Sequence, residues 1–342
     1  MPIRPAKRII GAIPEEPAAW YGPIVRIMRQ PQRALIDLVA LLVVAAAGGV
    51  ALTWAPDRPV EALAARWAKP PSQFIGLDGL SVHYRDEGPR DDPSPVVLLH
   101  GTSSSLHTWK GWVAALKGQH RMITMDLPGV GLTGPTTSGD YSIANAARFT
   151  LRLLDTLGVK RFVVGGNSLG GDIAWHVALA APDRVDRLIL VDAAGYDLVP
   201  ESMPIGFRMA RMKSLSWLFE RILPRAVVES SLRNVYGDPS RVTPQLIDRF
   251  YDLTLREGNR AALGARFAQI RPGADADRIK TLKLPTLILW GARDRLIPPD
   301  HARQFQRDIA GSVLVMYDSL GHVPHEEDPA RTVADVQRFL AR

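Results

Sequence analysis

The 342-residue sequence contains no cysteine. Disulfides, thiolate nucleophiles and cysteine-ligated metal sites are therefore excluded, although this absence leaves the cellular compartment open. No segment repeats at a fixed period, so the chain is not a repeat array. The composition, 46% hydrophobic and 23% charged, is typical of a globular protein and argues against general disorder.

Acidic residues are fewer than basic ones, with 35 Asp and Glu against 42 Lys and Arg, which gives a net charge of +7. Such a balance can indicate nucleic-acid binding. However, the basic residues are scattered along the chain, and no DNA- or RNA-binding motif is present. We therefore expect no nucleic-acid partner, and we interpret the basicity as a property of solubility and of contact with membrane surfaces.

Long hydrophobic runs are also rare, and the exception lies near the N-terminus. Residues 38–55 read LVALLVVAAAGGVALTWA, and residues 34–36 extend the run past a single Asp37. This length reaches the roughly 18 to 20 apolar residues that span a bilayer. It predicts a transmembrane anchor over 34–55, after an N-terminal segment 1–33 and before a linker 56–72.

Two other interpretations of this run are a buried core helix and the apolar part of a cleaved signal peptide. A core helix is disfavoured because the strand and helix pattern of the main domain, described below, begins only near Gln73. A signal peptide is disfavoured because no small-x-small cleavage site precedes Asp57. Basic residues lie mostly before the span, whereas acidic residues dilute those after it. This bias predicts a cytoplasmic N-terminus and a main domain on the non-cytoplasmic side. The residues compared are Arg26, Arg29 and Arg33 before the span, and Asp57, Arg58, Glu61, Arg66 and Lys69 after it.

From Gln73 onward, short apolar runs alternate with helical patterns such as 142–158, which ends in a glycine. Runs such as VVLL, MITM, FVVGG, LILV, TLILW and VLVMY suit strands buried on both faces of a parallel sheet. The order predicts an α/β fold with a doubly wound, mostly parallel sheet over 73–194 and 284–342. A ligand site is then expected beyond the carboxyl ends of the strands.

The strand pattern is interrupted between residues 195 and 283, where only helix-like stretches occur. An insertion of this length within a sheet domain predicts a helical cap. Trp217 and Phe219 in this insertion are candidate substrate-binding residues, although they could equally form the core of the cap itself. The stretch 207–225 is both cationic and apolar, so it either touches a membrane surface or packs as a cap helix.

Residues 166–170 read GNSLG, directly between an apolar strand pattern and a helical pattern. The order of strand, sharp turn and helix is that of a nucleophile elbow, which presents Ser168 at a helix N-terminus. A tight turn needs flanking residues with little side chain, which accounts for Gly166 and Gly170. A glycine-rich turn without function is the alternative interpretation of this motif.

A serine hydroxyl becomes a good nucleophile only when a base takes its proton. Asp294 and His322 each follow a predicted strand, so both should reach the edge of the sheet that carries Ser168. Asp192 is an alternative acid, whose other role would be to pin the turn into the cap. His325 lies further into its loop and is expected at the surface or facing the cap.

The negative oxygen that forms during acyl transfer needs two backbone N–H donors. We expect these from Leu169, which follows the nucleophile, and from Thr102 in the turn after the first parallel strand. The nearby Ser103 is a candidate substrate-binding residue, and Trp109 is expected to be a packing residue. This chemistry requires neither a metal nor an organic cofactor.

The motifs HGTSSSLHTW, DLPGVGLT, GNSLGG, LILWGARD and LGHVPHEEDP, from about Gln73 to the C-terminus, resemble those of the α/β-hydrolase superfamily. The resemblance implies the chain order nucleophile, acid, base, and therefore a triad of Ser168, Asp294 and His322. It also implies structural roles for Asp126 and Gly129. GNSLGG is similar to the elbow of carbon–carbon bond hydrolases of aromatic degradation, although HGTSSS replaces the more glycine-rich turn of that group.

These features predict a membrane-anchored serine hydrolase that acts on carboxylic esters with an apolar acyl or aryl group. One alternative is carbon–carbon bond or perhydrolase chemistry on the same triad. Others are a ligand-binding receptor with slow residual activity and a scaffold with a vestigial site. Turnover of a chromogenic ester would separate the enzyme hypotheses from the last two.

Overall fold

The computed structural model describes residues 22–342, so the part of the expected N-terminal segment over 1–21 lies outside the described residues. The chain divides between Leu52 and Thr53 into two units, which we describe separately.

The first unit contains α1, which runs from Gly22 to Thr53. Within it, the 21 residues Arg33–Thr53 are long and apolar enough to cross a membrane, and an 18-residue window among them has a mean hydropathy of 2.5. Most of the described leucine and valine side chains along this stretch are exposed. An isolated helix with apolar side chains all around is unfavourable in water and suits a hydrocarbon environment. By length and composition, α1 is therefore a candidate membrane span.

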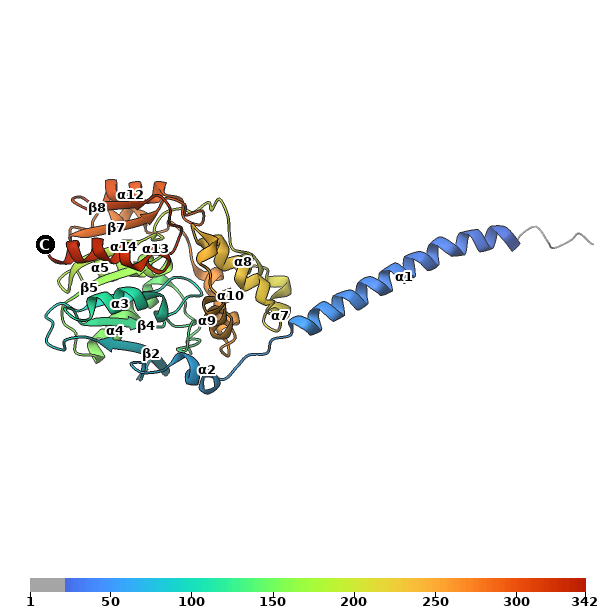
Figure 1. The fold of residues 1–342 in the computed structure, drawn as a ribbon, viewed down its shortest axis with the longest axis horizontal. Helices are drawn as coiled ribbons and strands as arrows, with labels where there is room; N and C mark the ends of the chain where they lie inside the picture. The colour runs from blue at the N-terminus through green and yellow to red at the C-terminus, as the bar shows by residue number, and fades with distance from the viewer. Residues whose placement is uncertain (1–21) are drawn as a thin grey trace, which may run out of the picture. The chain divides into compact units, whose positions relative to one another are not determined.

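The second unit, residues 53–342, is built around an eight-stranded sheet with the strand order β1-β2-β4-β3-β5-β6-β7-β8 (Figure 1). Strands β1 and β2 form an antiparallel hairpin around a turn at Asp78 and Gly79, and β2 pairs antiparallel with β4. All later pairings are parallel. The predicted α/β sheet is thus confirmed. The strands are β1 Gln73–Leu77, β2 Leu80–Glu87, β3 Val96–Leu99, β4 Met122–Met125, β5 Phe162–Asn167, β6 Val185–Val191, β7 Thr286–Gly291 and β8 Val313–Tyr317.

Helices cover both faces of this sheet and form a separate hydrophobic core on each. Alternate side chains of β3 enter different cores, since Val97 and Leu99 lie in one and Val96 and Leu98 in the other. Central strands such as β3 and β7 therefore read as continuously apolar, because they are buried on both faces. Helices α4 Ile143–Thr156, α5 Leu169–Ala180 and α12 Asp300–Asp308 contribute to the first core, and α3 Lys110–Leu116 and α14 Pro329–Leu340 to the second.

The chain between β6 and β7 forms the predicted helical insertion. A small core of its own, around Val228, Leu232 and Tyr236, holds part of it together. This segment is confirmed as helical. Its α-helices are α6 Ile205–Ala210, α7 Ser216–Phe219, α8 Arg225–Val235, α9 Pro244–Thr254, α10 Asn259–Gln269 and α11 Ala276–Ile279.

Residues 56–72, expected to be a linker, are packed against this insertion. They include α2, Val60–Trp67, whose Leu63 is buried against Leu132 and Leu253. Asp57 pairs with Arg260 of α10, and Arg66 pairs with Asp252 of α9. Sequence patterns could not show this packing, because the partners lie nearly 200 positions away.

Candidate active site

Ser168 occupies a strained turn between β5 and α5, with φ 56° and ψ −118°. Such a backbone is rare for a residue with a side chain and is typical of functional sites. A Cβ on Gly166 would lie 2.1 Å from the carbonyl oxygen of Gly170, and one on Gly170 would lie 2.1 Å from that of Leu99. Both positions therefore require glycine, because the chain segments approach too closely for any side chain.

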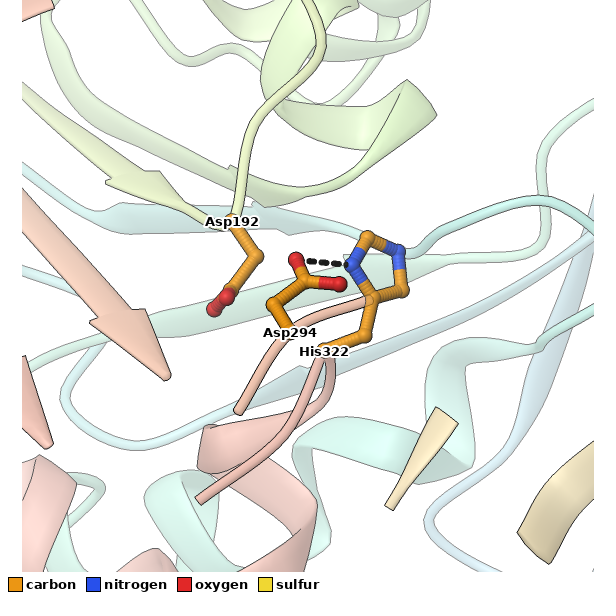
Figure 2. Close-up of side chains that lie close together, drawn as sticks. All are labelled: Asp192, Asp294 and His322. Carbon is orange, nitrogen blue, oxygen red and sulfur yellow. Dashed lines mark hydrogen bonds and ion pairs between the residues drawn. The ribbon is translucent and has the colours of Figure 1, made fainter. Parts of the chain in front are cut away.

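His322 and Asp294 form a hydrogen-bonded pair at the same edge of the sheet (Figure 2). The distance from His322 Nδ1 to Asp294 Oδ2 is 2.7 Å, and both side chains are almost fully buried. Asp294 Oδ1 also accepts from the backbone N–H groups of Leu296 and Ile297, at 2.8 and 3.0 Å. These donors fix the carboxylate, which in turn can orient the imidazole for acid–base chemistry.

Ser168 and His322 both line a cavity of about 180 Å³ between the sheet edge and the helical insertion. Thr102, Ser103 and Phe219 line the same cavity. Leu169 lines a second cavity of about 100 Å³, which also borders Ser168 and Thr102. The larger cavity has mostly apolar walls, drawn from α6, α7, α8 and α10. Ser168 thus borders both cavities.

Trp217 differs from the other predicted site residues. Its side chain is 66% exposed, and neither of these two cavities includes it. Phe219, two positions later, does line the larger cavity. Helical rotation separates the two aromatic residues, which the sequence placed together because they are close along the chain.

His325, expected at the surface or facing the cap, is instead completely buried, so this expectation was wrong. Its Nε2 lies 3.0 Å from Thr108 Oγ1, and its ring packs against Trp109 at a centroid distance of 4.1 Å. Burial, with smaller effects from His322 and Arg249, holds the pKa of His325 well below its usual value. The residue is therefore a neutral packing histidine. The same contact confirms Trp109 as a packing residue.

Asp126 connects the backbone at Leu106 and at Leu132 to His83 of β2. Its carboxylate accepts from the backbone of Leu106 and Leu132, at 2.8 Å in each case, and lies 2.7 Å from His83 Nδ1. Burial alone would raise the pKa of Asp126, but His83, with smaller contributions from His100 and His107, outweighs it, and the pKa lies below its usual range. The predicted structural role of Asp126 is thus confirmed.

Two residues that sequence reasoning missed hold the loop of His322. The Asn167 side chain donates to the carbonyl oxygens of His322 and Val191, at 2.9 and 3.1 Å. Glu327 accepts from the backbone N–H of Gly321 at 2.8 Å and of Gly237 at 3.0 Å. The position of Asn167 next to Ser168 in the sequence could have indicated its role, whereas nothing in the sequence around Glu327 indicated that it holds this loop.

The side chains of Asp192, Asp294 and His322 place their ligand atoms within 4.8 Å of one another, a spacing that could hold a metal ion. However, His322 Nδ1 and Asp294 Oδ2 already hydrogen-bond each other. A metal ion between them would have to replace this bond. The arrangement fits an acid–base pair better than a metal site.

Comparison with known proteins identifies the family. Residues 94–329 match the family model of the alpha/beta hydrolase fold, so the chain belongs to the α/β-hydrolase family and is a hydrolase. An uncharacterized protein of Mycobacterium tuberculosis is 30% identical, with 80% of this chain and 82% of that protein covered. The 2-hydroxy-6-oxo-2,4-heptadienoate hydrolase of Pseudomonas putida is 27% identical, with coverages of 79% and 96%. The crystal structure of a membrane phospholipase A, described as a bacterial virulence factor, is 25% identical with a TM-score of 0.67, and the match covers 91% of this chain and 98% of that one.

Proposed function

We propose that this protein is a membrane-anchored serine hydrolase that cleaves carboxylic esters through an acyl-enzyme. Ser168 attacks the ester carbonyl, while His322 takes its proton and returns it to the leaving alcohol. Asp294 orients the imidazole and stabilises the imidazolium that forms. The N–H groups of Thr102 and Leu169 bind the negative oxygen, and water then releases the acid.

The observation that carries this proposal is the common location of Ser168 and the His322–Asp294 pair at one cavity. The apolar walls of that cavity suit a substrate with a large apolar acyl or aryl group. Phe219, Val228 and Leu263, which come from three helices of the insertion, contribute to these walls. The position of Ser168 in the strained turn directly before α5 supports its choice as the nucleophile.

Attachment to the membrane through α1 is part of the proposal. Its support is the 21-residue apolar stretch and the coverage of the match to the membrane phospholipase A, which is wider than the 79% of the meta-cleavage product hydrolase from Pseudomonas fluorescens. The arginines before the stretch support a cytoplasmic N-terminus and a catalytic domain on the other side. Resistance to carbonate extraction tests the anchor, and protease added to spheroplasts tests the orientation. A catalytic domain protected from that protease would reverse the proposed topology.

A second candidate function is hydrolysis of a carbon–carbon bond on the same triad. Relatives named as hydrolases of 2-hydroxy-6-oxo-2,4-heptadienoate and of 2-hydroxymuconate semialdehyde favour it. Purified protein should be assayed on short esters, long esters and a vinylogous diketone, with labelling by an organophosphonate in parallel. Ester turnover that requires Ser168 supports the main proposal. Turnover of the diketone alone would favour the second candidate, and the absence of labelling would contradict both.

A further inference from the structure

The carboxyl group of Asp192 is a buried acid that the proposed mechanism does not use. Asp192 directly follows β6, has φ 43° and is fully buried. Its Oδ1 accepts from the backbone N–H of Gly291 at 3.0 Å. Its Oδ2 is buried and has no hydrogen-bond partner among the described residues. A charged carboxylate with one lone donor is costly in such a place.

The nearest acid is Asp294, and Figure 2 shows it between Asp192 and His322. The two aspartates are supported very differently. Asp294 is held by two backbone N–H groups and by His322 Nδ1, whereas the carboxylate of Asp192 accepts only from the N–H of Gly291 within the described part of the chain. Adjacent buried carboxylates cannot both remain ionised, so the less supported one should keep the proton.

The surroundings of Asp192 also favour its protonated form. Burial first, and then the charge of Asp294, raise the pKa of Asp192 well above its usual value. Glu327 adds a smaller contribution of the same sign. Tyr317, whose hydroxyl donates to Asp335, also faces Asp192 and is uncharged because its own pKa is raised, chiefly by burial.

We propose that Asp192 is a protonated carboxylic acid at neutral pH, and that its Oδ2–H donates a hydrogen bond to the Asp294 carboxylate. Asp192 is thereby a positioning residue for the Asp294–His322 pair. It supplies Asp294 with a fourth donor without adding a second negative charge. The protonation state follows from the local geometry alone, whereas its catalytic consequence rests on the proposed triad.

The consequence concerns how strongly Asp294 holds the imidazolium. A neutral donor draws electron density from the Asp294 carboxylate and so moderates its attraction for a protonated His322. An ionised Asp192 would do the opposite, because a second negative charge would stabilise the imidazolium further. The protonation state of Asp192 therefore sets the pH at which the base becomes available.

Infrared difference spectroscopy tests the protonation state without any substrate. Wild-type protein at neutral pH should show the carbonyl stretch of a protonated carboxylic acid, and Asp192→Asn should lose this band. Asp318→Asn, which changes an exposed aspartate, is the matched control and should retain it. Loss of the band in Asp294→Asn but not in Asp192→Asn would place the proton on Asp294 instead of Asp192 and overturn the proposal. Absence of the band from wild-type protein would do the same.

The pH profile of kcat/KM tests the positioning role. Asp192→Asn keeps a neutral donor, so the acid limb should stay in place and activity should change less than about threefold. Asp192→Gly accepts the positive φ but has no donor, so its acid limb should move to higher pH. A downward move of the acid limb in Asp192→Asn would mean that a negative charge had been removed, contrary to the proposal. If Asp192→Gly does not fold, the position of the acid limb in Asp192→Asn decides by itself whether Asp192 is neutral. The infrared result stands even if no ester is turned over, so failure of the two proposals can be distinguished.

Discussion

The sheet edge and the helical insertion are built in different ways, although both line the same cavity. At the sheet edge, polar side chains are buried and held by backbone donors, as Asp294 is by Leu296 and Ile297. In the insertion, the cavity walls are mostly apolar side chains from short helices, some of which pack around a small core of their own. Directed bonds fix geometry to fractions of an ångström, whereas apolar packing tolerates changes of shape. The comparison suggests that chemistry resides in the sheet and selectivity in the insertion.

The largest expected effect is at the nucleophile. Ser168→Ala should abolish labelling by an organophosphonate and lower kcat by about 10⁶-fold, because no other group can form the acyl-enzyme. Ser103→Ala changes a second cavity-lining hydroxyl and is the matched control, which should remain labelled. Persistent labelling of Ser168→Ala would show that the strained turn does not carry the reactive hydroxyl.

Loss of the acid should be next in size. Asp294→Asn should give a folded protein whose kcat is about 10³- to 10⁴-fold lower, because an amide favours the wrong tautomer of His322. Steady-state kinetics with a chromogenic ester measures this, with circular dichroism to verify folding. If Asp192→Asn caused the larger loss, the acid would have to be assigned to the end of β6 instead.

The junction of the two regions gives a stability prediction. A chain that starts at Pro70 lacks the buried Leu63 and the contacts of Arg66 and Trp67 with Asp252. Burial of one leucine alone contributes about 2 kcal/mol, so this chain should melt well below one that starts at Thr53. Differential scanning calorimetry of the two proteins makes the comparison. Equal melting temperatures would mean that residues 53–69 contribute nothing to the fold.

Selectivity should respond to the insertion more than reactivity does. Phe219→Ala should change the preference between long and short esters by about 10-fold and leave turnover of an acetyl ester nearly unchanged, because only larger substrates reach this wall. Trp217→Ala removes a similar aromatic group outside the cavity and is the matched control. Equal effects of Phe219→Ala on both esters would show that the side chain supports the fold rather than the pocket.

The smallest effect concerns the dependence of stability on pH. The pKa of Asp192 is higher in the folded than in the unfolded protein, so stability is lost as pH rises above the usual aspartate range. Asp192→Asn removes this loss, and its melting temperature relative to wild type should therefore increase from pH 4 to pH 8. Thermal melts across this range provide the measurement. A relative decrease would indicate that Asp192 is ionised and stabilising.

The difference between the two regions also explains how far the sequence could be interpreted. The central strands were predictable because burial on both faces makes them continuous apolar runs, as in β3 and β7. The helix over 142–158 was predictable from its local pattern and terminal glycine, and the structure adds a cap in which the Ser142 hydroxyl accepts from the Asn145 N–H. Trp217 and Phe219 could not be separated, because their exposure depends on how short helices pack. His325 was misplaced for a similar reason, since Trp109 and Thr108 lie more than 200 residues away.

The sequence by itself determined the sheet and the elbow at Ser168, because these depend on apolar periodicity and on glycines that the turn requires, whereas the order of the candidate triad came from the resemblance of its motifs to the α/β-hydrolase superfamily. Only the tertiary structure decided which carboxylate meets His322, and it placed Asp192 behind that pair. It also showed that residues 56–72 pack against the insertion. These features depend on contacts between distant segments, and the pattern of neighbouring residues carries no record of such contacts.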